Sequence, residues 1–187
     1  MTTKDNLNNI LKNIIERKHN ELGLGRDYSS IFSKIKDFEA NAIGQIGEEY
    51  VRKICKDITN IEQDDNDTVH NEFDISTKNG LKIEIKTARF GKKGTFQFNG
   101  IEPRRNYNYI LCLGICLDRV VYRIFSHDDI KYVHSVRKYY IEQGDDFKKQ
   151  LVQMNPDNLV SYKLTTNLKQ MIEIDYLPEE LNKICKS

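Results

Sequence analysis

The sequence contains no long hydrophobic run. No stretch approaches the roughly 18 consecutive apolar residues of a membrane-spanning helix, so we expect no membrane span. The opening residues, MTTKDNLNNILKN, also lack the apolar core and small-residue cleavage site of a secretory signal. Charged residues make up 30% of the chain and apolar residues 39%, which is typical of a soluble globular protein rather than a disordered one.

Cysteine and proline are also scarce. The four cysteines, Cys55, Cys112, Cys116 and Cys185, follow no disulfide-scaffold spacing, and none has a partner at zinc-ligand spacing. We therefore expect buried free thiols in a reducing cytoplasm. The three prolines mark loops rather than a linker, and a phosphate-binding GxxxxGK[ST] loop is missing. These absences favour a single domain over residues 1–187.

The net charge of +1 hides an uneven distribution of charge. Seven acids and no base lie between Asp57 and Asp74, whereas eight bases and two acids lie between Lys78 and Arg105. A basic segment of this kind can contact nucleic-acid phosphates. From charge alone, a solvated loop is the alternative.

Hydrophobic periodicity predicts helices before strands. Apolar residues recur at helical spacing over residues 5–20 and 37–56. The run 107–117 is apolar on both faces, as expected for a central strand covered on two sides, and 120–126 is predicted as its neighbour. Together with the helices, these strands predict an α/β fold.

The chain after His127 gives a mixed pattern. We expect two helices separated at Gly144, followed by short strands at 160–166 and 170–176. The prediction thus divides the domain into N-terminal helices at 1–56, a hairpin with central strands at 57–126, and a mixed region at 127–187.

The stretch 71-NEFDISTKNGLKIEIKTARF-90 predicts a β-hairpin around Asn79-Gly80. A two-residue turn would mix apolar and charged residues on each face. A three-residue loop, 78–80, pairs Ile75 with Ile83 and Phe73 with Ile85, and gives one clean apolar face. Burial favours this second register.

The other face of that hairpin sets Asp74 opposite Glu84, with Lys86 two residues further on. Like charges directly opposed on neighbouring strands are destabilising, so a shifted pKa, flanking lysines or a cation must offset the repulsion. Mg²⁺ suits such a site because it takes few protein oxygens and keeps several waters. From the hairpin alone, a solvent-facing lattice of carboxylates with Lys82 and Lys86 is the alternative.

Asp74, nine residues, and then 84-EIK-86 resemble the motif of the PD-(D/E)xK nuclease superfamily. That superfamily includes type II restriction endonucleases, Holliday-junction resolvases and repair nucleases. The helical 44-GQIGEEYV-51 is similar to the GxxGE form of its N-terminal helix, and the resemblance covers roughly residues 38–126. Two features depart from the family: Phe73 stands where proline is usual, and the link from Lys86 to the next strand reads poorly as a helix.

The resemblance implies a restriction-endonuclease-like core, in which helices flank a mixed central β-sheet. It also implies that Asp74, Glu84 and the backbone carbonyl of Ile85 bind Mg²⁺. Lys86 would orient or activate the attacking water and stabilise charge on the phosphate. Glu48 would assist through a second metal ion or a water.

Glu49 is the alternative to Glu48, because only the motif separates these neighbours. The implied activity is Mg²⁺-dependent hydrolysis of phosphodiester bonds in double-stranded DNA, and a homodimeric type II restriction endonuclease is the favoured form. A structure-selective repair or recombination nuclease is the second hypothesis. A DNA-binding module without catalysis is the third.

Basic and polar residues after the hairpin are candidate DNA contacts. Gln97 could contact a base edge or the scissile strand, although a polar position on a strand is the simpler interpretation. The full set of candidates is Arg89, Lys92, Lys93, Gln97, Arg104 and Arg105. The region 127–187 is a further candidate, for DNA recognition or dimerisation.

Overall fold

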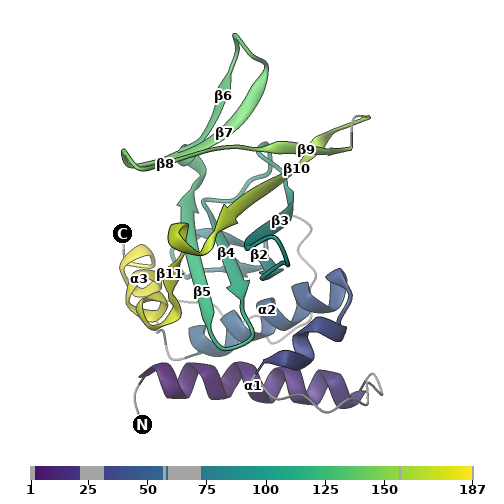
Figure 1. Ribbon diagram of the computed structural model, residues 1–187. Helices are drawn as coiled ribbons and strands as arrows, with labels where there is room; N and C mark the ends of the chain where they lie inside the picture. The colour runs from purple at the N-terminus through teal and green to yellow at the C-terminus, as the bar shows by residue number, and fades with distance from the viewer. Residues whose placement is uncertain (1–2, 22–31, 57, 59–72, 156, 187) are drawn as a thin grey trace.

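The computed structural model describes residues 3–21, 32–56, 58, 73–155 and 157–186 (Figure 1). Its helices are α1 (Thr3–Glu21), α2 (Ala40–Cys55) and α3 (Leu177–Ile184), and short 3-10 turns lie at Ser33–Asp37, His127–Asp129, Leu168–Gln170 and Ile174–Tyr176. The strands are β1 (Ile75–Ser76), β2 (Lys82–Arg89), β3 (Thr95–Ile101), β4 (Tyr109–Ile115), β5 (Val120–Ser126), β6 (Ile130–Val133), β7 (Lys138–Gln143), β8 (Phe147–Gln150), β9 (Val152–Asn155), β10 (Asn158–Asn167) and β11 (Ile172–Glu173).

A five-stranded mixed sheet forms the centre, in the order β1-β2-β4-β5-β11. β2 and β4 run parallel, and the other neighbours run antiparallel. The predicted α/β class, with a mixed sheet flanked by helices, is confirmed. β4 is the expected central strand: Leu111 and Leu113 belong to one hydrophobic core, and Ile110 and Cys112 belong to another.

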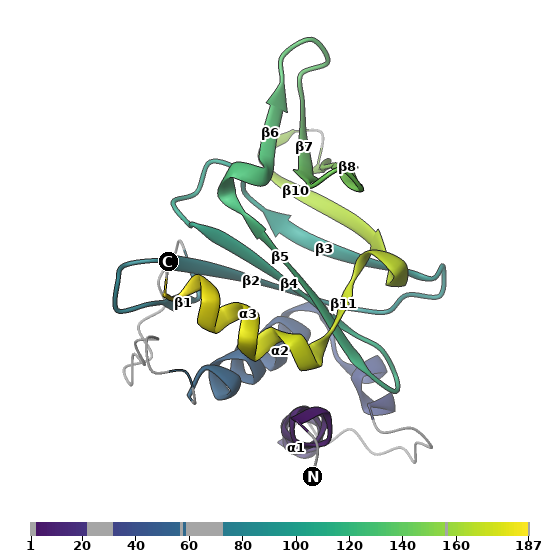
Figure 2. The same cartoon turned by 90° about the vertical axis from the view of Figure 1, so that its left-hand side faces the viewer.

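The described helices pack on one face of this sheet (Figure 2). The apolar stripe of α1 is buried, including Leu11 and Ile14, and packs with α2 and α3 in one core. Each such side chain contributes roughly 1.5–3 kcal/mol when fully buried. α2 approaches β2 very closely, because a Cβ at Gly47 would lie 1.9 Å from Thr87 Oγ1. Within the described residues, no helix has the length and apolar character needed to cross a membrane.

A second sheet, β3-β10-β9, covers the opposite face. Phe96 and Phe98 of β3 are fully buried there, and Gly114 of β4 leaves room for the Phe96 ring. The link between β2 and β4, which reads poorly as a helix, therefore contains a strand. Alternation explains this: Phe96 and Phe98 point inward while Gln97 and Asn99 are exposed.

The two helices predicted after His127 are wrong. This segment forms a third sheet, β6-β7-β8, whose hairpin projects away from the helices (Figure 1). Its cross-strand pairs are aromatic or branched, with Ile130 opposite Ile141 and Tyr132 opposite Tyr139, and such pairs stabilise strands. Gly144, expected to separate helices, has φ 60° and lies in the turn between β7 and β8.

The strands expected near the C-terminus are partly confirmed. The range 160–166 lies inside β10, but only Ile172–Glu173 of the range 170–176 is a strand. The residues on either side of β11 form 3-10 turns instead. A two-residue strand is enough here because it adds only an edge to β5.

All four cysteines are free and buried, as expected. Burial raises the pKa of the Cys55 thiol to about 12 and that of the Cys116 thiol to about 11. Because the thiolate is the reactive form of cysteine, these side chains are unsuited to nucleophilic catalysis at neutral pH.

Candidate active site

The β1–β2 hairpin adopts the register that the sequence predicts. Ile75 pairs with Ile83 and Ser76 with Lys82. The Thr77 N–H donates to the Leu81 carbonyl at 2.9 Å, and Gly80 takes the left-handed conformation with φ 82°. The three-residue loop and the glycine that it requires are confirmed.

The ladder ends at Ile75, before the predicted pairs of Asp74 and Phe73. Strand pairing stops at Ile75, so the expected cross-strand pairs of Asp74 with Glu84 and of Phe73 with Ile85 do not form. Instead, the Asp74 N–H donates to the Ile83 carbonyl at 3.0 Å, and Asp74 Oδ2 accepts the Ile85 N–H at 2.6 Å. A carboxylate is a strong acceptor for a backbone N–H that a strand no longer pairs. Glu72, which the predicted register would place opposite Lys86, lies outside the described residues.

Glu84 is the buried carboxylate of the site, with only 5% of the residue exposed. Lys86 Nζ donates to Glu84 Oε1, and Arg105 Nη1 lies 4.0 Å from the same oxygen. Burial raises the pKa of Glu84 above its ordinary value, and Asp74 raises it further, whereas Lys86 lowers it. The two carboxylates therefore repel one another although they are not paired across the ladder.

The pKa of Asp74 is also raised. Burial raises the pKa of the Asp74 carboxyl, opposed by the hydrogen bond from the Ile85 N–H and by the charges of Lys86 and Arg52. Arg52 also donates to the Asp74 carbonyl at 3.4 Å. Sequence reasoning missed Arg52, although it follows Glu48 by four residues and therefore shares a face of α2 with it.

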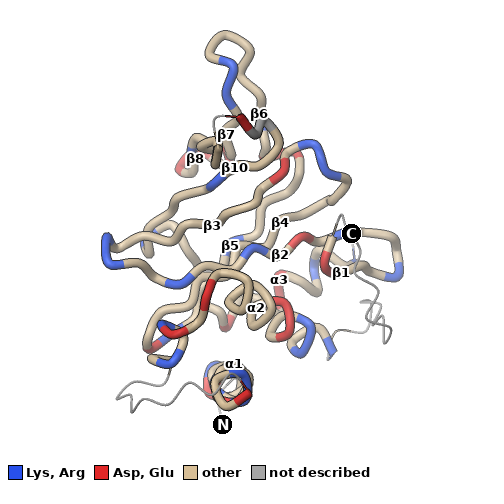
Figure 3. Tube along the Cα trace, turned by 90° about the vertical axis from the view of Figure 1, so that its right-hand side faces the viewer, with Lys and Arg blue, Asp and Glu red and all other residues tan. Residues whose placement is uncertain are grey.

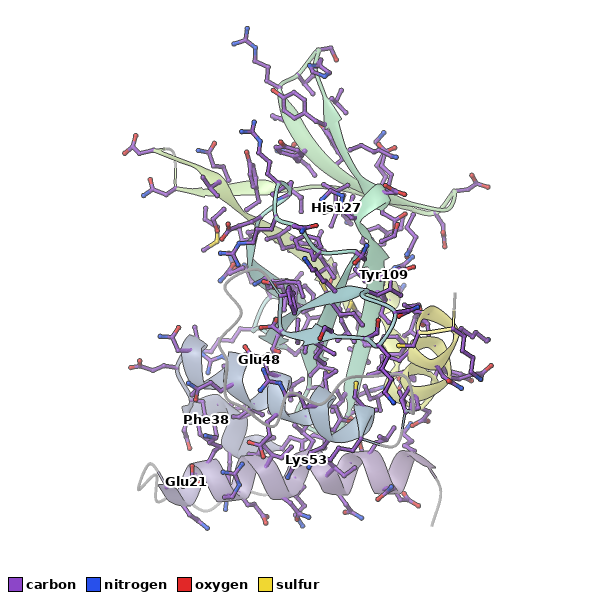
Figure 4. All side chains as sticks on the ribbon, turned by 180° about the vertical axis from the view of Figure 1, so that it is seen from behind. Glu21, Phe38, Glu48, Lys53, Tyr109 and His127 are labelled. Atoms are coloured by element: carbon purple, nitrogen blue, oxygen red, sulfur yellow. The ribbon has the colours of Figure 1, made fainter. Side chains whose placement is uncertain are left out.

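Glu48 lies on α2, where Figure 4 labels it, and the charges of Asp74, Lys86 and Glu84 act on its carboxyl. Burial raises the pKa of its carboxyl from 4.5 to about 7, and the charge of Asp74 is the next cause. Glu49 lies elsewhere: it accepts from Arg17 of α1 and is 3.4 Å from Lys53 Nζ. Glu48 is thus placed with the carboxylates of the hairpin, and Glu49 holds α2 against α1.

The three carboxylates could share a divalent cation. Within the described parts of the chain, no group of three or more His, Cys, Asp or Glu side chains forms a ready-made metal cluster. However, Glu48, Asp74 and Glu84 each have a raised pKa, which a nearby cation would lower. The Ile85 carbonyl lies on β2 beside Glu84, and oxygen donors of these kinds fit Mg²⁺.

Two of the predicted DNA contacts lie near this site. Arg105 lies in the loop between β3 and β4. Its Nε is 2.8 Å from Glu102 Oε2, and its Nη1 is 4.0 Å from Glu84 Oε1. Arg104 lies next to it and donates to the Tyr139 hydroxyl at 3.3 Å. Figure 3 shows acidic and basic positions meeting along β1 and β2.

The other predicted contacts are not brought to the carboxylates. Arg89 donates to the Lys36 carbonyl at 2.8 Å, so it anchors the turn before α2. Lys92 and Lys93 lie in the exposed turn between β2 and β3, and Gln97 is an exposed residue of β3 opposite Thr165. Gln97 thus occupies a polar position on a strand, which is the simpler of the two interpretations.

The chain matches no protein-family model and no curated protein significantly. Function must therefore be inferred from the placement of Glu48, Asp74, Glu84 and Lys86.

Proposed function

We propose that this protein is a Mg²⁺-dependent DNA endonuclease of the PD-(D/E)xK type. The observation that carries the proposal is that Glu48, Asp74 and Glu84 are all at least partly buried and interact electrostatically with Lys86, whose ammonium group donates to Glu84. Perturbed groups of this kind cluster at functional sites. The order helix, hairpin, central strand supports the finer proposal of a restriction-endonuclease-like core.

Asp74, Glu84 and the Ile85 carbonyl would hold Mg²⁺, and Glu48 would assist from α2. When bound, the ion supplies Lewis-acid polarisation of the phosphate and a lower pKa for coordinated water.

The side chains of the protein would divide the remaining chemistry. Lys86, half-buried beside Glu84, would position the attacking water and neutralise charge that develops on the phosphate. Glu48, whose carboxyl is next to Asp74 and Glu84, would accept a hydrogen bond or a proton from that water, and the charge of a bound cation would lower its pKa from the metal-free value of about 7. Arg105 would attract the phosphate to the same place, because its guanidinium already lies 4.0 Å from Glu84.

The preferred substrate is double-stranded DNA cut at specific sites by a homodimer, as in a type II restriction endonuclease. Two copies related by a two-fold axis would place one carboxylate cluster at each DNA strand. The four buried free thiols suit a reducing compartment, so we propose the cytoplasm as its location.

The decisive experiment incubates the purified protein with unmethylated phage DNA in Mg²⁺ or in EDTA. Lys86→Ala is tested beside Lys82→Ala, a matched lysine on the same strand that lies over the Phe73 ring instead. We expect discrete fragments that require Mg²⁺, persist with Lys82→Ala and vanish with Lys86→Ala.

Other outcomes change the proposal in defined ways. A smear, or cutting restricted to branched DNA, would replace site-specific cleavage with a repair or recombination activity. Intact DNA in every reaction, with DNA binding retained, would contradict catalysis and favour a binding module.

A further inference from the structure

The β6–β7 hairpin carries a cluster of aromatic side chains on one face. Tyr132 and Tyr139 are directly opposed, with ring centroids 4.9 Å apart. Tyr162 of β10 extends the cluster at 5.2 Å from Tyr139, and His134 extends it at 4.8 Å from Tyr132. Tyr132 is 40% exposed, so the cluster is open to a partner rather than closed into the core.

The charge around this aromatic face is positive. The outer part of the hairpin, 131–138, contains Lys131, Arg137 and Lys138 and no acid. Arg104 lies against Tyr139, and within the described residues no carboxylate forms a salt bridge with Arg104, Lys131 or Arg137. An anionic partner would therefore meet cations that are not already neutralised.

The aromatic face is connected to the candidate active site by consecutive residues. Arg104 contacts Tyr139, and its neighbour Arg105 lies 4.0 Å from Glu84. On β3, a Cβ at Gly100 would lie 3.8 Å from Lys86 Nζ, and Tyr162 pairs with the next residue, Ile101. One extended partner could thus contact Lys86 and the hairpin together.

The outer hairpin has the shape of a two-stranded ribbon. β8 pairs with Tyr140–Gln143 of β7, and the Leu151 N–H donates to the Tyr139 carbonyl at 2.9 Å, so within the described residues the ladder has no third strand beyond Tyr139. The two outer pairs, Tyr132 with Tyr139 and Val133 with Lys138, span roughly 7 Å at about 3.3 Å per residue, and the turn 134–137 extends them further; the major groove of B-DNA is about 8.5 Å deep. That groove admits a two-stranded ribbon of protein.

We propose that the β6–β7 hairpin enters the major groove of the DNA duplex whose phosphodiester lies at Lys86. Tyr132 and His134 would meet base edges, and Arg104, Lys131 and Arg137 would meet phosphates. This inference rests on the proposed function. Arg137 supports it, because it has φ 54° in a turn where glycine would fit without strain.

The first test measures binding to a random-sequence 30-bp duplex by fluorescence anisotropy, in EDTA and in a Lys86→Ala background that prevents cutting. We expect Tyr132→Ala to weaken binding about tenfold, roughly the effect of one lost contact to a base edge. Arg137→Gly should lower the slope of log Kd against log salt by about one, because one phosphate contact is lost. Tyr176→Ala and Lys183→Ala are the matched controls, since both residues are on or next to α3 and should leave binding unchanged.

The second test identifies the groove. Methylation of guanine N7, a major-groove atom, should interfere with binding of the Lys86→Ala protein. Tyr132→Ala should reduce that interference, because Tyr132 is the side chain placed at the base edges, and Lys183→Ala should preserve it. Interference only from minor-groove methylation, or tighter binding to single strands than to duplex, would overturn the groove assignment.

The two proposals can fail separately. If the wild type cuts DNA, Lys86→Ala does not, and the hairpin variants bind like their parent, the inference is overturned while the nuclease stands. If the wild type cuts nothing but the hairpin variants lose binding and N7 interference, the nuclease fails while the hairpin remains a DNA-contacting element.

Discussion

The hairpins β1–β2 and β6–β7 place their polar residues in opposite environments. In β1–β2, Glu84 is buried and Asp74 is half-buried, and burial raises the pKa of both carboxyls. In β6–β7, Tyr132 and the basic side chains of Lys131, Arg137 and Lys138 are exposed to solvent. Burial gives charged groups unusual chemistry, whereas exposure gives a surface that a large partner can reach. The two hairpins suit two different tasks on one substrate.

The largest expected effect comes from the buried side of this comparison. Glu84→Gln removes the central carboxylate and leaves Lys86 without its partner. We expect cleavage of phage DNA to fall on the order of 100-fold or more, and Mg²⁺ to stop raising the Tm of the protein. Cleavage assays and thermal melts with and without Mg²⁺ measure both effects. Wild-type rates in the variant would show that Glu84 belongs to a structural ion pair.

A second prediction concerns the contact that brings Glu48 to the hairpin. In Gly47→Ala the new Cβ would lie 1.9 Å from Thr87 Oγ1, so α2 must move away from β2. We expect a loss of about 1–3 kcal/mol in the free energy of unfolding and slower cleavage. Gly44→Ala is the control, since its nearest neighbour would be Glu48 Oε1 at 4.0 Å. Thr87→Ala should partly rescue Gly47→Ala, and denaturant titration measures each variant.

The dependence of stability on pH should come from Glu48. Its pKa is raised from 4.5 to about 7 by folding, so the folded state binds the proton more tightly than the unfolded state. The metal-free protein should therefore gain stability as pH falls from about 8 towards 5, on the order of 2 kcal/mol after allowance for solvent screening.

Glu48→Gln should flatten this pH dependence in denaturant titrations performed in EDTA. Glu49→Gln removes the neighbouring carboxylate, which contacts Arg17, and should keep the slope. A steep slope that survives Glu48→Gln would assign the effect to Asp74 or Glu84 instead.

The smallest expected effect tests the exposed hairpin. Arg137→Gly relieves a left-handed conformation that a side chain adopts at a cost of about 1 kcal/mol, although glycine returns part of this as chain entropy. We expect the free energy of unfolding to change by less than about 0.5 kcal/mol in calorimetry while DNA binding weakens. A large loss of stability would mean that Arg137 serves the fold.

The first hairpin could be predicted because its information is local. Asn79-Gly80 sets the turn, and alternation from Leu81 to Lys86 sets the faces, so the register follows from adjacent residues. The end of the ladder at Ile75 could not be predicted. It depends on Asp74 capping the Ile85 N–H, a contact between side chain and backbone that competes with strand pairing.

The sequence of the second hairpin predicts helices, and the reason is physical. Ile130, Val133 and Val136 recur at a spacing of three, which imitates a helical stripe. What decides the structure is pairing across the turn, such as Tyr132 with Tyr139, and burial of Ile141 against the second sheet. Interactions with residues distant in the sequence are absent from a local pattern. Within the candidate site, Arg52 was missed because its partner is a carbonyl 22 residues away.

Strand β2 has a consequence for how this protein can change over generations. Ile83 and Ile85 belong to the helix-side core, and Glu84 and Lys86 alternate with them. Deleting one residue within the strand would exchange the two sets, so a single event would remove both the carboxylate cluster and the packing. The exposed turn at Gly91–Gly94 contributes neither to the core nor to the carboxylate cluster. Insertions and deletions among descendants of this chain should therefore accumulate at that turn, while the length of β2 should stay constant.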